Sequence, residues 1–202
     1  MKKINYKLHL GVIGEGNKGK NMILKFLSHL AISPSSSSLN DEFQIIHQSI
    51  SLKVKVFQAE KVKDFVDLYD SIERLDVIIQ ILDLYNPHSV SQIHQDEYFK
   101  FYNLYNFQGS KVLAAMDMDL INGKINDEKL RISRLSLVRK TQELNFIYCF
   151  EIINQQSDFD ELFDKIFDDT ILKFKFSNPE LYEQALVYGN VLSNQDDHDN
   201  QK

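Results

Sequence analysis

Residues 11–21 read GVIGEGNKGKN, a glycine-rich stretch between a predicted strand and a predicted helix. Gly14, Gly19 and Lys20 match all but the last position of the phosphate-binding pattern G-x-x-x-x-G-K-[ST]. The last position of that pattern supplies a hydroxyl to Mg²⁺, and here it is Asn21. The stretch therefore predicts a strand-to-helix turn of the phosphate-binding type without its metal ligand.

The composition is that of an ordinary globular chain, with 202 residues, 43% of them hydrophobic and 26% charged. The net charge is −6 and there is no long basic run, which argues against a direct nucleic-acid partner. No apolar run approaches the roughly 20 residues that span a bilayer, so we expect no membrane partner. The single cysteine, Cys149, excludes an internal disulfide.

Strand and helix patterns alternate along the chain, which favours an α/β fold. Strands are predicted over Leu8–Ile13, Phe43–Ile50, Leu52–Phe57, Asp76–Leu84, Lys111–Met116 and Phe146–Ile152. Helices are predicted over about Lys20–Leu30, Val62–Ile72, Ser89–Leu104, Lys129–Leu144, Phe159–Phe176 and Pro179–Tyr188. We expect a mostly parallel six-stranded sheet with helices on both faces. The predicted domain covers 1–176, and a short helix and a disordered acidic tail cover 177–202.

The order and spacing of these elements resemble the Ras-like small GTPases, which have a P-loop NTPase fold. The segments that carry the resemblance are Tyr6–Gly14, Asp76–Ser89, Val112–Leu120, Ile147–Glu151 and Asp160–Phe163. The resemblance implies a site for GTP or GDP with Mg²⁺. Within that site, Gly14, Gly19 and Lys20 correspond to the phosphate loop, and Asp119 corresponds to the residue that reads guanine.

Most other parts of that implied site are missing from this sequence. Gln58–Lys61 replaces the D-x-x-G motif, Met116–Asp119 keeps only the aspartate of N-K-x-D, and Ile152–Gln155 replaces S-A-K. The threonine expected between Ser33 and Gln44 is absent from the sequence. We interpret the chain as a pseudo-GTPase with no catalytic residue, no metal site and no bound cofactor.

The matching residues also have structural explanations. Gly14 and Gly19 suit a tight strand-to-helix turn, and Lys20 can be a solvated lysine. Asp119 suits a turn residue as well as a vestigial base-reading one. Asp83, which ends an apolar run, fits a turn better than a metal ligand.

The predicted helix Ser89–Leu104 and the residues after it contain an aromatic run, YFKFYNLYNF, at residues 98–107. A helix buries one stripe of side chains, so part of this run is available to a partner. We predict a partner surface at Tyr98, Phe101, Tyr102 and Tyr105.

Among Ras-like proteins without a nucleotide site, the chain resembles the centromere protein M family of the inner kinetochore. The runs that carry this resemblance are Ser51–Val56, Arg74–Ile78, Phe107–Val112 and Phe146–Glu151. It implies a non-catalytic, structural chromosome protein of the nucleus that acts through protein–protein interaction. Its implied partners are centromere proteins I, H and K, whose complex it would stabilise for kinetochore assembly and chromosome segregation. The chain departs from that family in a longer connection before Asp76 and in keeping Lys20.

Two alternatives remain at the level of sequence. The first is a divergent Rab- or Ras-like small GTPase, cytoplasmic, that still binds GTP or GDP with Mg²⁺ through Gly14–Lys20. The second is a small P-loop kinase, whose basic lid would have to be Lys129–Lys140.

Overall fold

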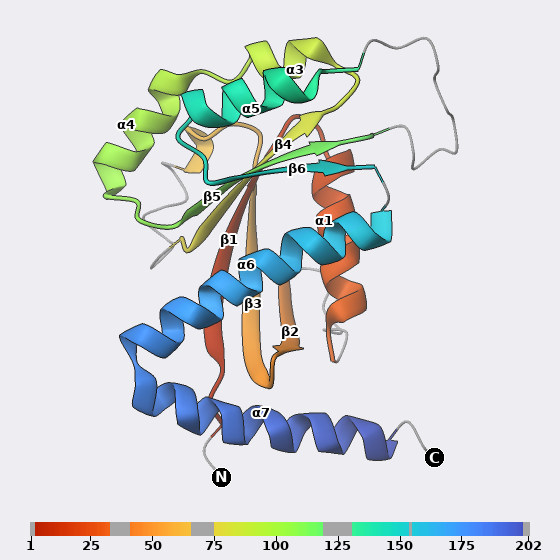
Figure 1. Cartoon of the computed structure of the whole chain (residues 1–202), viewed down its shortest axis with the longest axis vertical. Coiled ribbons are helices and arrows are strands. Elements are labelled where there is room, and N and C mark those ends of the chain that lie inside the picture. The colour runs from red at the N-terminus through yellow and green to blue at the C-terminus, as the bar shows by residue number, and fades with distance from the viewer. Residues whose placement is uncertain (1–2, 33–40, 66–74, 119–130, 154, 200–202) are drawn as a thin grey trace.

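A six-stranded sheet forms the centre of the protein, as a computed structural model shows (Figure 1). The structure describes residues 3–32, 41–65, 75–118, 131–153 and 155–199. The strands are β1 (Tyr6–Ile13), β2 (Glu42–His47), β3 (Ile50–Ala59), β4 (Val77–Asp83), β5 (Ser110–Met116) and β6 (Tyr148–Ile152). Their order is β2-β3-β1-β4-β5-β6, and all neighbours are parallel except the β2–β3 pair. The predicted α/β fold with a mostly parallel six-stranded sheet is confirmed.

Helices cover both faces of the sheet, each over its own hydrophobic core. The helices are α1 (Lys18–Leu30), α3 (Pro87–Ser91), α4 (Gln95–Tyr105), α5 (Arg134–Glu143), α6 (Gln155–Ser177) and α7 (Pro179–Asp199). Side chains of α1, α6 and α7 share one core, and side chains of α4 and α5 share the other. Because both faces are covered, a central strand such as β4 is buried along nearly its whole length.

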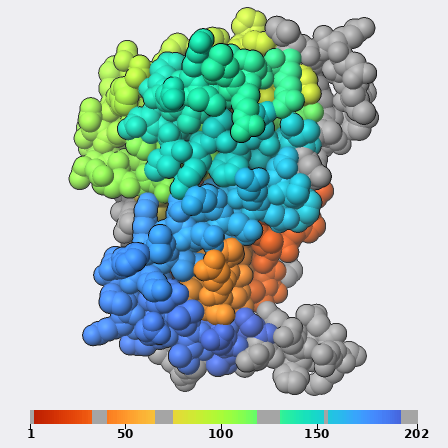
Figure 2. All heavy atoms as spheres, viewed as in Figure 1, coloured from red at the N-terminus to blue at the C-terminus, as the bar shows by residue number. Residues whose placement is uncertain are grey.

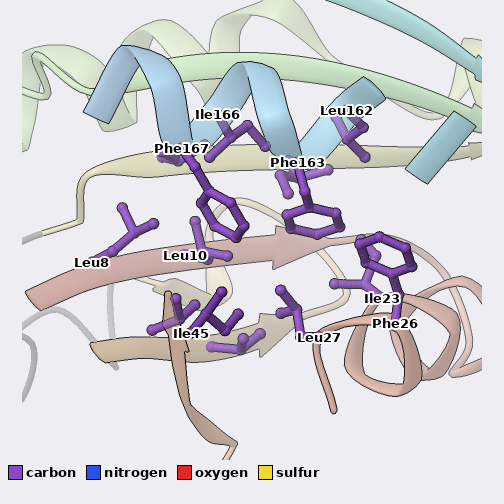
Figure 3. Close-up of a cluster of buried hydrophobic side chains, with 14 of the residues drawn as sticks. Leu8, Leu10, Ile23, Phe26, Leu27, Ile45, Leu162, Phe163, Ile166 and Phe167 are labelled. Atoms are coloured by element: carbon purple, nitrogen blue, oxygen red, sulfur yellow. The ribbon is translucent and has the colours of Figure 1, made fainter. Parts of the chain in front are cut away.

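The first core joins three segments that lie far apart in the sequence. In Figure 3, Phe26 of α1 and Phe163 of α6 lie against each other between the helices, and Phe167 of α6 lies over Leu10 of β1. The rings of Phe26 and Phe163 are stacked with their centroids 5.2 Å apart. Leu162, Ile166 and Phe167 extend this contact along α6, as the helical spacing of the sequence predicts.

The predicted helix over Ser89–Leu104 is divided into α3 and α4. Asn86 caps α3, since its side chain accepts a hydrogen bond from the backbone N–H of His88, and Pro87 opens the helix. Between the two helices, Ile93 turns inward and is 8% exposed. The helix predicted over Lys129–Leu144 starts instead at Arg134, because Ser133 accepts a hydrogen bond from the N–H of Ser136. Most of the helix predicted over Val62–Ile72 lies outside the described residues.

The last helix differs most from the prediction. α7 continues to Asp199, so the predicted helix end at Tyr188 is wrong, and residues 193–199 of the tail predicted to be disordered are helical. Ala185 of α7 is buried in the first core, and Tyr188 of the same helix is 6% exposed. Residues 179–188 are therefore part of the packed domain, and the core does not stop at the predicted boundary of 176.

The turn between β2 and β3 lies between α6 and α7. In Figure 2 the orange surface of this hairpin is bordered by the two blue helices. Gln48 and Ser49 form the two-residue turn with φ of 46° and 60°, the conformation of a type I′ hairpin. Asp168 of α6 accepts hydrogen bonds from the side chain of Gln48 at 2.8 Å and contacts Nε2 of His47 at 2.7 Å. On the other side, Gly189 of α7 packs directly against the carbonyl of Ser49.

Candidate functional site

The glycine-rich loop connects the end of β1 to the start of α1, as the sequence predicts. Gly16 is its residue with positive φ, at 62°, a conformation that disfavours other residues. Gly14 and Gly19 are glycines for a different reason, which the sequence did not reveal. A methyl group on Gly14 would lie 2.9 Å from Cβ of Ile81, and one on Gly19 would lie 2.8 Å from Cγ2 of Ile81. The two glycines let the loop approach β4 closely.

Lys20 is buried beneath the loop and is 4% exposed, so it is not the solvated lysine that the sequence also allowed. Its Nζ donates to the carbonyl oxygen of Gly14 at 3.0 Å and to that of Ala59 at 3.4 Å. The side chain thus ties α1 to the ends of β1 and β3. Its charge is directed at backbone oxygens below the loop.

A cleft of about 530 Å³ lies above the loop, at the carboxyl ends of β1, β3 and β4. Open α/β sheets place their ligands at this edge. Among the residues that the structure describes, the charged and titratable side chains that line the cleft are Glu15, Lys18, Glu60, Lys61, Asp83, His94, Glu97 and Tyr98. We call it the loop cleft.

The charges of the loop cleft do not suit a polyphosphate. Of the described residues, four carboxylates line it against two lysines, and Glu15 lies within the glycine loop itself. Phosphate sites in proteins collect cations and backbone N–H groups, because like charges in a partly enclosed cleft repel strongly. Lys20, the lysine that the motif reserves for phosphate, is already bonded to carbonyl oxygens.

The structure also places the other residues considered for a nucleotide site. Asp83 accepts a hydrogen bond from the N–H of Tyr85 at 3.0 Å, which confirms the interpretation of a turn residue. Glu60 and Lys61, from the segment that replaces D-x-x-G, line the loop cleft. Asp119 lies outside the described residues.

Two general features of the described residues bear on ligands. In this part of the chain, no group of three or more His, Cys, Asp or Glu side chains is arranged to hold a metal ion. None of the described helices combines the length and apolar character needed to cross a membrane.

The predicted aromatic partner surface is wrong for half of its residues. Tyr98 and Phe101 face the sheet and are each 2% exposed. Tyr102 and Tyr105 are half-buried against the second core. Tyr102 stacks on Phe107, with a centroid distance of 5.9 Å. The stripe predicted to bind a partner is mostly the side of α4 that packs against the domain.

A buried polar pair at the floor of the loop cleft was missed by sequence reasoning. The hydroxyl of Tyr98 donates to Oε1 of Gln80, and Nε2 of Gln80 donates to the carbonyl of Ile81 at 2.8 Å. Both side chains line the cleft. Gln80 interrupts the apolar run of β4, and that interruption was the available indication of a buried polar contact. The pair joins α4 to β4 directly beneath the cleft.

Stability at alkaline pH should depend on Tyr98. Burial, with smaller contributions from Tyr102 and Glu97, raises its pKa well above the usual value of 10.0. Above about pH 10 the folded state therefore keeps the Tyr98 proton, whereas the unfolded state releases it. The contribution of this group to the free energy of unfolding is fully present below about pH 10 and falls as pH rises above that value. Tyr98→Phe should lose about 1–3 kcal/mol at neutral pH, because Oε1 of Gln80 loses its donor, and its stability should fall less between about pH 10 and 11. Urea unfolding at both pH values measures this, and equal pH dependence in the two proteins would contradict it.

The fold and the position of the loop define an α/β protein of the broad kind that includes Rossmann-like and P-loop proteins. Neither the models of known protein families nor the sequences of curated proteins match this chain.

Proposed function

We propose that this chain is a non-catalytic pseudo-GTPase of the Ras-like P-loop type that acts by binding other proteins. The strand order, the antiparallel β2 at one edge and the loop between β1 and α1 support the fold assignment. The observation that carries the loss of nucleotide binding is the loop cleft itself. Its phosphate lysine is bonded to carbonyl oxygens, and its lining is predominantly acidic.

The interactions within the loop cleft favour an empty site over weak nucleotide binding. Two of the three N–H donors of the Lys20 ammonium already donate to carbonyl oxygens, so a phosphate reaching it would gain one of its hydrogen bonds or compete for the others. It would also approach Glu15 and Glu60 without a metal ligand at Asn21 to offset their charge. The D-x-x-G and S-A-K motifs, whose contacts with nucleotide would offset these unfavourable terms, are absent from the sequence.

The test is a titration of the full chain with fluorescent GDP and GTP analogues, with and without Mg²⁺. We expect no saturable signal up to about 100 μM nucleotide. A genuine small GTPase treated identically is the positive control. A dissociation constant below about 1 μM that rises in Lys20→Ala but not in Lys18→Ala would instead establish the divergent GTPase.

We further propose the inner kinetochore as the place where this chain works, as a nuclear subunit that stabilises centromere proteins I, H and K. Support comes from the four sequence runs that resemble the centromere protein M family, which lie on or beside β3, β4, β5 and β6. Co-expression with those three proteins should give one complex on size exclusion, and a tagged chain should localise to centromeres. Separate elution of the chain from those three proteins would contradict this assignment. So would the recovery of exchange factors or vesicle proteins with the tagged chain.

A further inference from the structure

A second hollow lies on the other side of α1 from the buried Lys20. It has a volume of about 350 Å³ and is formed between α1 and the start of α6, which Figure 1 shows next to each other. Its main lining side chains are Lys18, Met22, Lys25, Phe26 and His29 of α1 and Phe159 of α6. We call it the α1–α6 groove.

The floor of the groove is apolar and rigid. Phe26 and Phe159 are 5% and 2% exposed, and their rings stack with centroids 5.2 Å apart. Both rings are held from below by the first core, where Figure 3 shows Phe26 against Phe163. Met22 is half-buried beside them and provides a flexible apolar wall. An apolar side chain entering the groove would meet a preformed surface.

The rim of the groove is basic. Lys18, Lys25 and His29 are exposed on one face of α1, and they span 12 residues, or about 16 Å of helix. Among the described residues that line the groove there is no carboxylate. This contrasts with the net charge of −6 of the whole chain and with the acidic lining of the loop cleft. The charged side chains that line the groove are therefore of one sign, and the carboxylate of Asp160 beside it is bonded to Gln156.

We propose that the α1–α6 groove binds an acidic amphipathic peptide segment of a partner protein. One or two apolar anchors of the segment would lie on Phe26 and Phe159, and flanking Asp or Glu side chains would pair with Lys25 and its neighbours. A groove of this volume accommodates a few side chains, which suits a short helical turn better than a folded domain. The proposal does not depend on the loss of nucleotide binding, because the groove and the loop cleft share only Lys18.

The test begins with random peptides of about 12 residues, displayed on phage and selected against the immobilised full chain. Selected peptides should be rich in Asp and Glu around a Leu, Ile or Phe. One of them, labelled with a fluorophore, is then titrated by anisotropy with the wild-type chain and with Lys25→Glu. We expect Lys25→Glu to weaken binding by about tenfold, and binding to weaken as salt rises from about 0.05 to 0.5 M.

Lys100→Glu is the matched control, because Lys100 is an exposed helical lysine on α4, over the opposite face of the sheet. It should bind the peptide as the wild type does. Selection of neutral or basic peptides, failure to enrich any peptide, or equal affinities of Lys25→Glu and Lys100→Glu would each overturn the proposal. Circular dichroism of both variants, whose changed residues are exposed, establishes that they are folded.

Discussion

Replacing Gly189 with alanine is expected to lower the free energy of unfolding by about 2 kcal/mol or more. The methyl group would lie 1.9 Å from the carbonyl oxygen of Ser49 and 2.6 Å from its carbon. Normal contacts between such atoms are about 3.5 Å, so α7 or the hairpin turn must move. Both partners are backbone, which means that no side chain can rotate to relieve the overlap.

Two opposing effects of Gly189→Ala can be compared in size. Alanine in a helix interior is favoured over glycine by about 1 kcal/mol. Overpacking of a tight contact costs about 1–3 kcal/mol and more when backbone must shift, so the steric cost should prevail.

Asn190→Ala is the control for Gly189→Ala, since Asn190 is the next residue of α7 and is exposed. It introduces alanine into the same helix without the contact to Ser49, and its stability should be equal to or slightly above wild type. Urea unfolding followed by circular dichroism compares the two. A Gly189→Ala protein as stable as Asn190→Ala would show that α7 does not pack on the hairpin as described.

Phe163→Ala is expected to have a still larger effect, a loss of about 4 kcal/mol. Phe163 is 1% exposed and lies at the centre of a row of rings between α1 and α6. Its centroid is 5.2 Å from that of Phe26 and 5.7 Å from that of Phe167. Removing it leaves a cavity lined by rings that are fixed by their own helices, so collapse of the site is limited.

Phe176→Ala tests whether the effect at Phe163 comes from burial. Phe176 lies on the same helix but is 77% exposed, and its replacement should change stability by less than about 0.5 kcal/mol. The midpoints of urea unfolding, measured for both variants, give the comparison. Similar losses in the two would contradict the packing of α6 described above.

Much of the fold could be predicted because its strands are apolar runs. Its first helix comes directly after the glycine-rich loop, and other helices have an apolar stripe at helical spacing. β4 and α6 are the clearest cases, since burial on both faces and burial of one stripe leave distinct patterns. α7 was predicted too short because Gly189 has the appearance of a helix end, where glycine is common. Its actual role is to approach Ser49, a contact between segments 140 residues apart in the chain. The residues around Gly189 in the sequence do not indicate such a long-range contact.

The candidate site could be located from sequence, but its chemistry could not be read from it. The motif correctly placed Gly14 after the first strand and Gly19 and Lys20 in the first turn of the following helix. What it could not reveal is that Ile81 of β4 occupies the space that makes both residues glycine, or that Lys20 is bonded to carbonyl oxygens. The partner surface predicted from the aromatic run at 98–107 was wrong because a sequence pattern was given too specific a meaning. Aromatic content does not distinguish a face that packs against the sheet from one that meets a partner.

The turn at Gln48 and Ser49 has a further consequence for how the protein opens. The tip of a hairpin is commonly where exchange of amide protons with solvent begins. Here the tip is bonded to Asp168 and covered by Gly189, so exposing it requires α6 or α7 to detach. The amides of the β2–β3 pair next to the turn should consequently exchange together with those of the first core. The edge of the sheet formed by β2 is then among the last parts of the fold to open.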